Sequence, residues 1–197
     1  MKIINLKNEK YLMNKGESGF TLLETLIAIF IMTVAFTALL TLMTTSMFSA
    51  RYANNEITAT YLAQEAMDYI RNDRDTTAFL NSNWSVGGTT SFIGHYGDPS
   101  LGTECFDSSA GCMVDANLGV VNGCLGTCPS LFYESAPGGG AYYVYSSSST
   151  TRPTSFVRTV KMDLVNPDEL AVTVLVSWKN GSVSRTQELK ASLLKWQ

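Results

Sequence analysis

The first quarter of the chain contains a long stretch without charges. Residues 25–48 include no Asp, Glu, Lys or Arg, and 24 residues in a helix extend about 36 Å at 1.5 Å per residue. The hydrocarbon core of a bilayer is about 30 Å thick. This pattern predicts a membrane-spanning helix, which we place at residues 20–50, and the stretch is too long for an ordinary secretory signal.

The helical pattern continues beyond the uncharged stretch, because residues 51–75 contain no Gly or Pro. The apolar positions recur every three to four residues, as in an amphipathic helix, at Ile57, Tyr61, Leu62, Ala66, Tyr69 and Ile70. The polar positions, which we expect mostly on the opposite side, are Glu56, Gln64, Glu65, Asp68, Arg71, Asp73 and Arg74. One helix from about residue 21 to about residue 73 extends about 80 Å, and its second half needs a covering layer.

Residues 155–197 alternate between apolar and polar positions, as strands with one buried face do. Two strands carry their apolar residues at even positions: Phe156, Val160, Met162 and Leu164, then Val172, Val174, Val176 and Trp178. Asn180-Gly181 is a dipeptide favoured by two-residue type I′ hairpins. The return strand carries Val183, Leu189, Ala191 and Leu193 and ends near Trp196. We therefore predict an α+β fold in which the N-terminal helix packs on a C-terminal antiparallel β-sheet.

Residues 76–154 have the composition of loops with short strands, since they hold 12 of the 15 glycines and all four cysteines. Outside the cytoplasm, four cysteines predict two disulfides, and all three pairings stay open. The candidates are Cys105, Cys112, Cys124 and Cys128. Their spacing does not match a structural zinc site, and the one histidine, His95, lies ten positions before the first cysteine, so we expect no metal.

Other residues of this region are better explained by turns than by chemistry. Asp98, Asp107 and Asp115 do not form a calcium-loop pattern, and we predict that they stabilise turns. His95, without a nucleophile motif, is interpreted as a surface loop residue, and Gly138-Gly139-Gly140 as a flexible turn. No active site is predicted, and the chain is not expected to be an enzyme.

A group of aromatic residues lies before the C-terminal strands. It comprises Phe132, Tyr133, Tyr142, Tyr143 and Tyr145. These side chains could form a contact surface, since exposed aromatics carry much of the energy at interfaces, or they could belong to a buried strand. Alternation favours the buried strand for Tyr143 and Tyr145.

A motif stands directly before the uncharged stretch. It reads Lys15-Gly16-Glu17-Ser18-Gly19-Phe20-Thr21-Leu22-Leu23-Glu24, behind a basic segment, residues 1–19, with four lysines and two glutamates. The motif resembles the prepilin cleavage and methylation site of type IV pilins and type II secretion pseudopilins. The resemblance implies cleavage by a prepilin peptidase after Gly19, methylation of Phe20 and an assembly role for Glu24. The alternative is an uncleaved signal anchor in which Glu24 reaches the membrane interface.

Glu24 needs a partner, because an acid in hydrocarbon costs about 2.5 to 3.5 kcal/mol even on the milder insertion scale. Cleavage after Gly19 creates an α-ammonium group on Phe20, which stays chargeable after methylation. The Glu24 carboxylate of a neighbouring subunit can offset the desolvation of this ammonium and fix the axial register of packed helices. The resemblance implies the same pairing in a filament.

The membrane half departs from many major pilins, which carry a glycine or proline that loosens the helix. Here the corresponding stretch carries Thr33 and Thr41. Hydroxyls in this half could bond to carbonyls one turn back and bend the helix mildly, could contact neighbouring helices, or could simply be tolerated in the span. The threonines concerned are Thr25, Thr33, Thr37, Thr41, Thr44 and Thr45.

The resemblance implies a structural subunit, either a minor pilin or a pseudopilin, of a type IV pilus or type II secretion-like filament. Expected partners are the prepilin peptidase/methyltransferase, other pilin or pseudopilin subunits, the assembly machinery and membrane lipid, with no cofactor. The expected location is the cytoplasmic membrane, crossed once, with the C-terminal part outside the cytoplasm and the filament extracellular or periplasmic. Short stretches of the last strands resemble minor pilins of the modification type and I-type pseudopilins: Arg158-Thr159-Val160, Val176-Ser177-Trp178 and Leu194-Lys195-Trp196.

An alternative function is a pilus-tip module that uses the disulfide-tied loops for adhesion or DNA capture. The formal net charge is -3 at pH 7, and loss of residues 1–19 makes it -5. Since electrostatic DNA binding needs an excess of Lys and Arg, no nucleic-acid partner is expected.

Overall fold

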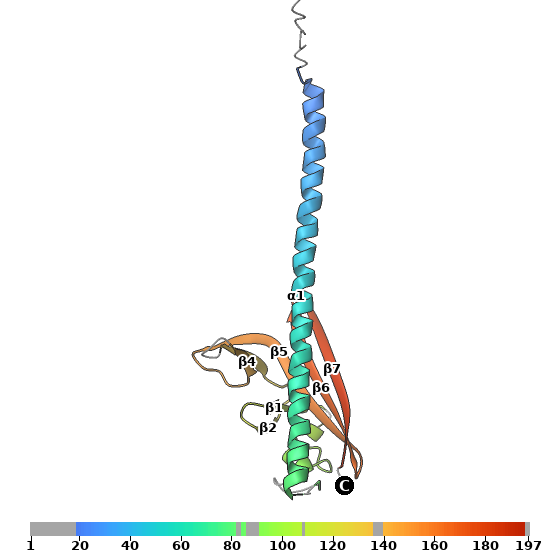
Figure 1. Ribbon diagram of the computed structural model, residues 1–197, viewed down its shortest axis with the longest axis vertical. Coiled ribbons are helices and arrows are strands. Elements are labelled where there is room, and N and C mark those ends of the chain that lie inside the picture. Colours follow the sequence, from blue (N-terminus) through green and yellow to red (C-terminus); the bar gives the residue numbers. More distant parts are fainter. Residues whose placement is uncertain (1–18, 82–83, 86–90, 108, 136–139, 196–197) are drawn as a thin grey trace, which may run out of the picture. The chain divides into compact units, whose positions relative to one another are not determined.

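The computed structural model describes residues 19–81, 84–85, 91–107, 109–135 and 140–195. They belong to two compact units, of which the first ends at Phe48 and the second, hereafter the head, begins at Ser49. Helix α1 (Leu22–Asn81) contributes residues to both units (Figure 1). The basic leader predicted for residues 1–19, apart from Gly19, lies outside the described residues, as do Trp196, Gly138 and Gly139.

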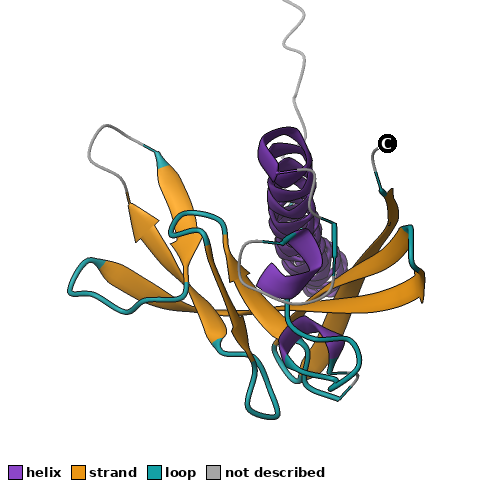
Figure 2. Cartoon of the chain, turned by 90° about the horizontal axis from the view of Figure 1, so that it is seen from below, coloured by secondary structure: helices purple, strands orange, loops and turns teal. Residues whose placement is uncertain are grey.

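The described residues of the head form one sheet of seven strands next to the head's part of α1. Two short helical elements, α2 (Phe92–His95) and the 3-10 helix η1 (Glu104–Phe106), precede the sheet in the chain. The strands are β1 (Cys112–Asp115), β2 (Val120–Gly123), β3 (Ser130–Ser135), β4 (Ala141–Val144), β5 (Thr151–Asn166), β6 (Glu169–Asn180) and β7 (Val183–Leu194). Figure 2 shows the strands curving around one side of the helix.

β5 organises the sheet, because it pairs along one edge with β6 and along the other with β3 and β1. β6 pairs in turn with β7, while β2 and β4 pair with β1 and β3. All these pairs are antiparallel, so the predicted C-terminal meander is confirmed as β5–β6–β7. The α+β class, with a long N-terminal helix and an antiparallel sheet, is confirmed with it.

The β6–β7 turn differs from the predicted type. Asn180 pairs with Val183, so the two central residues are Gly181 and Ser182 rather than Asn180 and Gly181. Gly181 has a φ of 63°, and it is the one turn residue with a positive φ. A positive φ at the first central position alone is the pattern of a type II′ turn, which favours glycine there. The hairpin was predicted correctly, but its register was wrong by one residue.

The core lies between the sheet and one side of α1, and its helical part is rich in small residues. The helix contributes Ala59, Leu62, Ala63, Ala66, Met67 and Ile70, all buried. Ile57 and Tyr61, predicted for the buried side, are instead 54% and 67% exposed. The prediction assumed that the largest apolar residues mark the buried side of the helix. The sheet instead covers the side where alanines allow the closest approach of helix and strands.

The even-numbered apolar positions of the last strands are confirmed as the inner face. Phe156, Val160, Met162, Val172, Val174, Val176 and Trp178 are buried, and Leu164 packs against them. Tyr143 and Tyr145 also pack against this core, as alternation predicted, while Tyr142 is exposed.

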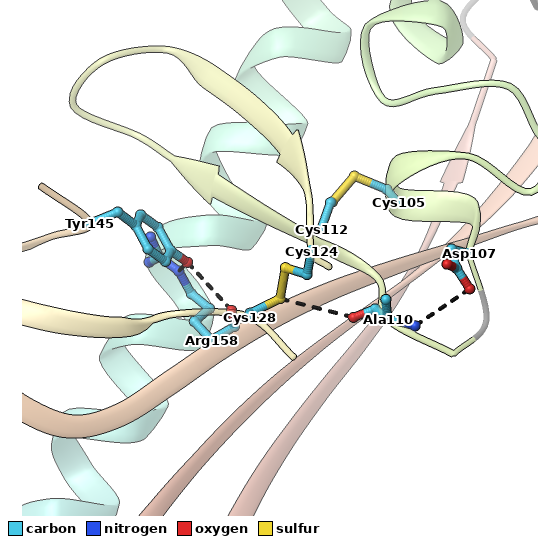
Figure 3. The surroundings of a disulfide bond; sticks show 8 residues. All are labelled: Cys105, Asp107, Ala110, Cys112, Cys124, Cys128, Tyr145 and Arg158. Atoms are coloured by element: carbon cyan, nitrogen blue, oxygen red, sulfur yellow. Dashed lines mark hydrogen bonds between the residues drawn. A yellow bond between two sulfur atoms is a disulfide. The ribbon is translucent and has the colours of Figure 1, made fainter. Parts of the chain in front are cut away.

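The loop region is fixed by two disulfides, which join Cys105 to Cys112 and Cys124 to Cys128 (Figure 3). The first lies in the main core. The second forms a smaller cluster with Ala110, which packs on Val157. Because Val157 has odd parity on β5, this cluster lies on the sheet face opposite to α1.

Three aspartates hold turns in this region, as predicted. The carboxylate of Asp98 accepts hydrogen bonds from Ser100, and that of Asp107 from Ser109 and the Ala110 N–H. The Asp115 carboxylate accepts from the N–H groups of Asn117 and Leu118. These local bonds replace the backbone partners that regular structure would supply.

Candidate functional site

Two residues that lie before α1, Gly19 and Phe20, are exposed. Gly19 and Phe20 precede the helix, and the Phe20 side chain is 80% exposed. A Cβ atom at Gly19 would meet no atom within 4 Å. None of the described residues covers the Gly19–Phe20 bond, and the regular helix begins at Leu22, two residues after Phe20.

Thr21 caps the helix and places Glu24 in its first turn. The Thr21 hydroxyl accepts a hydrogen bond of 3.3 Å from the Glu24 N–H, and the Thr21 carbonyl accepts one of 3.2 Å from the Thr25 N–H. A carboxylate in the first turn also interacts favourably with the positive end of the helix dipole. The sequence reasoning missed this cap, although Thr21-Leu22-Leu23-Glu24 matches the capping-box pattern and could have revealed it.

In the described part of the first unit, the large apolar side chains are all exposed. The smallest exposed fraction among them is 51%, at Ile27. The helical span found between Leu22 and Phe79 contains a window of mean hydropathy 2.5, none of which is buried. A surface of this size and composition requires lipid or other apolar helices around it.

The threonine hydroxyls in the membrane half of this helix are satisfied by the helix itself. The threonines from Thr25 to Thr45 named above donate to carbonyl oxygens three or four residues earlier, over 2.7–3.2 Å. The bonding to carbonyls one turn back, one of the possibilities left open by the sequence, is therefore observed. Because these polar groups are paired internally, they add little to the cost of an apolar environment.

The head contains a buried cation that was not predicted. Arg158 is 1% exposed on the inner face of β5. Its guanidinium donates to the Glu65 carboxylate at 2.6 Å, to the Leu62 carbonyl at 3.0 Å and to the Val114 carbonyl at 2.8 Å. The even parity of position 158 among buried residues was the signal that could have found it.

The Arg158 contacts join three elements of the head, α1, β1 and β5. A further bond of 3.3 Å runs to the hydroxyl of Tyr145, whose ring lies under the guanidinium, and that hydroxyl approaches the Arg158 carbonyl (Figure 3). Burial lowers the pKa of Arg158, but its contacts with Tyr145 and Glu65 outweigh this effect and raise the pKa above the ordinary value. The guanidinium is therefore charged, and it positions α1 on the sheet.

His95 is not the surface loop residue that we predicted. It ends α2, its side chain is about one-third exposed, and Nδ1 lies 3.0 Å from the Asp73 carboxylate on α1. The hydrogen bond to Asp73 raises the pKa of His95, burial lowers it, and the charges of Asp73 and Glu104 raise it, with a net increase over 6.5. Two polar residues of α1 that we placed on its outer side, Glu65 and Asp73, therefore have partners in the head.

This pair predicts a pH effect on the head. Because the folded pKa of His95 is raised, the pair's contribution to stability is present below pH 6.5 and is lost as pH rises through the folded pKa. We expect an NMR titration of the single histidine in the full chain to give a pKa above 6.5 that falls in Asp73→Asn but not in the neighbouring Asp75→Asn. A pKa unchanged by Asp73→Asn would contradict the pairing.

Comparison with known proteins identifies one feature of the chain. A family model described as the prokaryotic N-terminal methylation motif matches residues 14–40. The match includes the Gly19–Phe20 junction, Glu24 and the first part of the uncharged helix. Searches among curated proteins and solved structures found no match.

Proposed function

We propose that this chain, which carries the prepilin methylation motif of the type IV pilin and pseudopilin family, is a structural subunit of a type IV pilus or a type II secretion-like filament. Members of this family are structural, non-enzymatic proteins. The motif implies processing by a prepilin peptidase and a membrane-anchored precursor. The finer role proposed here is that of a minor pilin or pseudopilin.

One observation carries this proposal. The methylation motif leads directly into an apolar helix whose side chains are exposed along the whole first unit. Lipid covers such a helix before assembly, and equivalent helices of other subunits can cover it afterwards. The open Gly19–Phe20 junction supports cleavage at this bond.

Each segment of the N-terminal part has a proposed role. Cleavage after Gly19 releases the basic leader and leaves Phe20 as the N-terminal, methylated residue. Its ammonium pairs with Glu24 of a neighbouring subunit, and residues 25–48 form the filament core. The precursor spans the cytoplasmic membrane once, with the head outside the cytoplasm, and the assembly machinery transfers it into the filament.

The experiment is release of the subunit from cells by shearing, in strains with and without an active prepilin peptidase. We expect the chain in the sheared filament fraction only when the peptidase is active. A processed chain that stays wholly in the membrane fraction, in cells that assemble filaments, would contradict the proposal.

A further inference from the structure

The head carries a group of cations close to the residues that follow the uncharged stretch. Arg51 and Tyr52 stand three and four residues after that stretch ends, at the start of the head part of α1. The guanidinium of Arg185 lies over the Tyr52 ring, 5.5 Å from its centre, and so places β7 next to this point of α1. Lys179 and Val183 flank the turn that joins β6 to β7, close to Arg185 along the strands. We call these five residues the basic surface.

The three cations of the basic surface are exposed, and no carboxylate among the described residues forms an ion pair with them. The next acid along α1, Glu56, is four residues after Tyr52 and is itself exposed. Tyr52 and Val183 are 37% and 49% exposed. Other cations of the head lie 2.6–3.7 Å from a carboxylate: Arg71, Arg74, Arg158, Lys190 and Lys195. The basic surface therefore offers positive charge that the described head does not neutralise.

The two ends of the β5–β6–β7 meander differ in charge. Residues 49–56 and 177–187, which include the basic surface, contain three cations and one acid, so their net charge is 3 - 1 = +2. Residues 163–169 and 188–195, toward the other end, contain two cations and four acids, so their net charge is 2 - 4 = -2. The head is therefore polarised in charge, with the basic surface at its positive end.

The connectivity of the chain determines what lies beside the basic surface in a membrane-anchored precursor. Arg51 follows the uncharged stretch by three residues, about 4.5 Å along a helix, so it reaches the boundary of a bilayer that contains residues 25–48. Tyrosine, lysine and arginine are the residues that anchor proteins at this boundary. Because Arg185 contacts Tyr52, the β6–β7 hairpin reaches the same boundary.

We propose that the basic surface rests on anionic phospholipid head groups before assembly, and this inference depends on the membrane-anchored precursor of the proposed function. Arg51, Lys179 and Arg185 contact lipid phosphate groups, while Val183 and the Tyr52 ring lie toward the acyl chains. The head then meets the bilayer at two points far apart in the sequence, on α1 and on the β6–β7 hairpin. This contact fixes the orientation of the head on the membrane, and assembly must break it.

The contact is weak enough to be reversible. Each lysine or arginine near an anionic membrane surface changes binding about fivefold. Three cations alone hold a free protein on a membrane only loosely, but the apolar helix already keeps the head at the bilayer and raises its effective concentration there. Because the attraction is electrostatic, salt should weaken it.

Fluorescence quenching in reconstituted vesicles tests the contact. The full chain is placed in vesicles of phosphatidylcholine alone or of an equal mixture of phosphatidylcholine and phosphatidylglycerol. A fluorophore is attached to Ser182→Cys in the β6–β7 turn, and a spin label on lipid head groups quenches it at short range. All four native cysteines are in disulfides, so the introduced thiol is the reactive one. We expect strong quenching in the mixed vesicles and weak quenching in phosphatidylcholine or at high salt.

Charge removal adds a second readout. Lys179→Gln combined with Arg185→Gln should lower the ratio of docked to free head about 10- to 30-fold in the mixed vesicles. The matched control, Lys190→Gln combined with Lys195→Gln, removes the same charge farther along the chain and should leave the quenching unchanged. A fluorophore at Val165→Cys, an exposed valine near the other end of β5, should not be quenched in either lipid.

The outcomes separate this inference from the proposed function. Equal quenching of the Ser182 label in both lipids, or quenching that survives the Lys179 and Arg185 changes, would overturn the lipid contact and leave the filament role intact. A chain that does not float with the vesicles would contradict the membrane-anchored precursor itself. If the two changes abolish binding of a short DNA duplex but do not alter the quenching, the basic surface binds nucleic acid and the lipid contact is overturned.

Discussion

Replacing Arg158 with alanine is expected to destabilise the head by about 3 to 5 kcal/mol. The change leaves the Leu62 and Val114 carbonyls without their donor, separates Glu65 from its counter-charge and opens a cavity beneath Tyr145. Each lost hydrogen bond to the charged guanidinium costs about 1.5 to 3 kcal/mol, and Glu65 recovers part of its hydration because it is only partly buried.

Urea unfolding of the detergent-solubilised full chain, followed by tryptophan fluorescence, measures this effect through Trp84 and Trp178 in the head core. Arg152→Ala is the matched control, because Arg152 is an exposed arginine of the same strand and should cost less than about 0.5 kcal/mol. Arg158→Lys keeps the charge but not the planar fork, so it should fall between them. Equal midpoints for Arg158→Ala and Arg152→Ala would contradict the role assigned to Arg158.

Replacing Glu24 with alanine is expected to lower the amount of the chain in sheared filaments at least about tenfold. In the proposed filament, the Phe20 ammonium of the next subunit would then lie unpaired in an apolar bundle. Insertion into the membrane should not suffer, since the change removes the acid from the apolar end of the helix. Processing should also continue, because the Gly19–Phe20 junction is unchanged. The loss would therefore be specific to assembly.

Two controls accompany this variant. Glu56→Ala removes an exposed acid from the head part of α1 and should leave assembly unchanged. Glu24→Gln keeps the shape of the side chain without its charge, and it should behave like Glu24→Ala if the ammonium is the partner. Normal filament levels of Glu24→Gln would show that charge pairing does not drive assembly.

Patterns of neighbouring residues predicted those features of the molecule that depend on neighbouring residues alone. The uncharged stretch gives the apolar helix, and strict alternation gives the inner faces of β5 and β6, because side chains of a strand point alternately to opposite sides. The methylation motif was visible because a basic leader, Gly19, Phe20, Glu24 and the apolar helix occur in one order.

Features that depend on distant contacts were harder to predict. The burial of Ala59 and Ala63 rather than Ile57 and Tyr61 follows from where the sheet packs, which a helix with apolar residues on several sides does not reveal. The partners of Arg158 come from positions 62, 65 and 114, far away along the chain. The cysteine pairing likewise depends on loop paths, and four cysteines allow three connectivities.

The first unit has an exposed apolar surface and an acidic residue that other molecules must cover and pair. Its threonine hydroxyls are bonded internally, its apolar side chains are exposed, and Glu24 stands at its capped N-terminal end. Lipid can cover the apolar surface but offers Glu24 no fixed counter-charge. In the proposed filament, a neighbouring subunit that begins at Phe20 would supply both an apolar helix and a counter-charge for Glu24.

The mass of the N-terminal peptide shows whether the chain is processed as a prepilin. The chain is extracted from membranes of cells with and without an active prepilin peptidase, and its N-terminal peptide is identified by mass spectrometry. We predict a peptide that begins at Phe20 and carries one added methyl group when the peptidase is active, and a peptide that includes residues before Gly19 when it is absent. A chain that keeps its leader in the presence of active peptidase would contradict the account and return the first unit to the role of a plain membrane anchor.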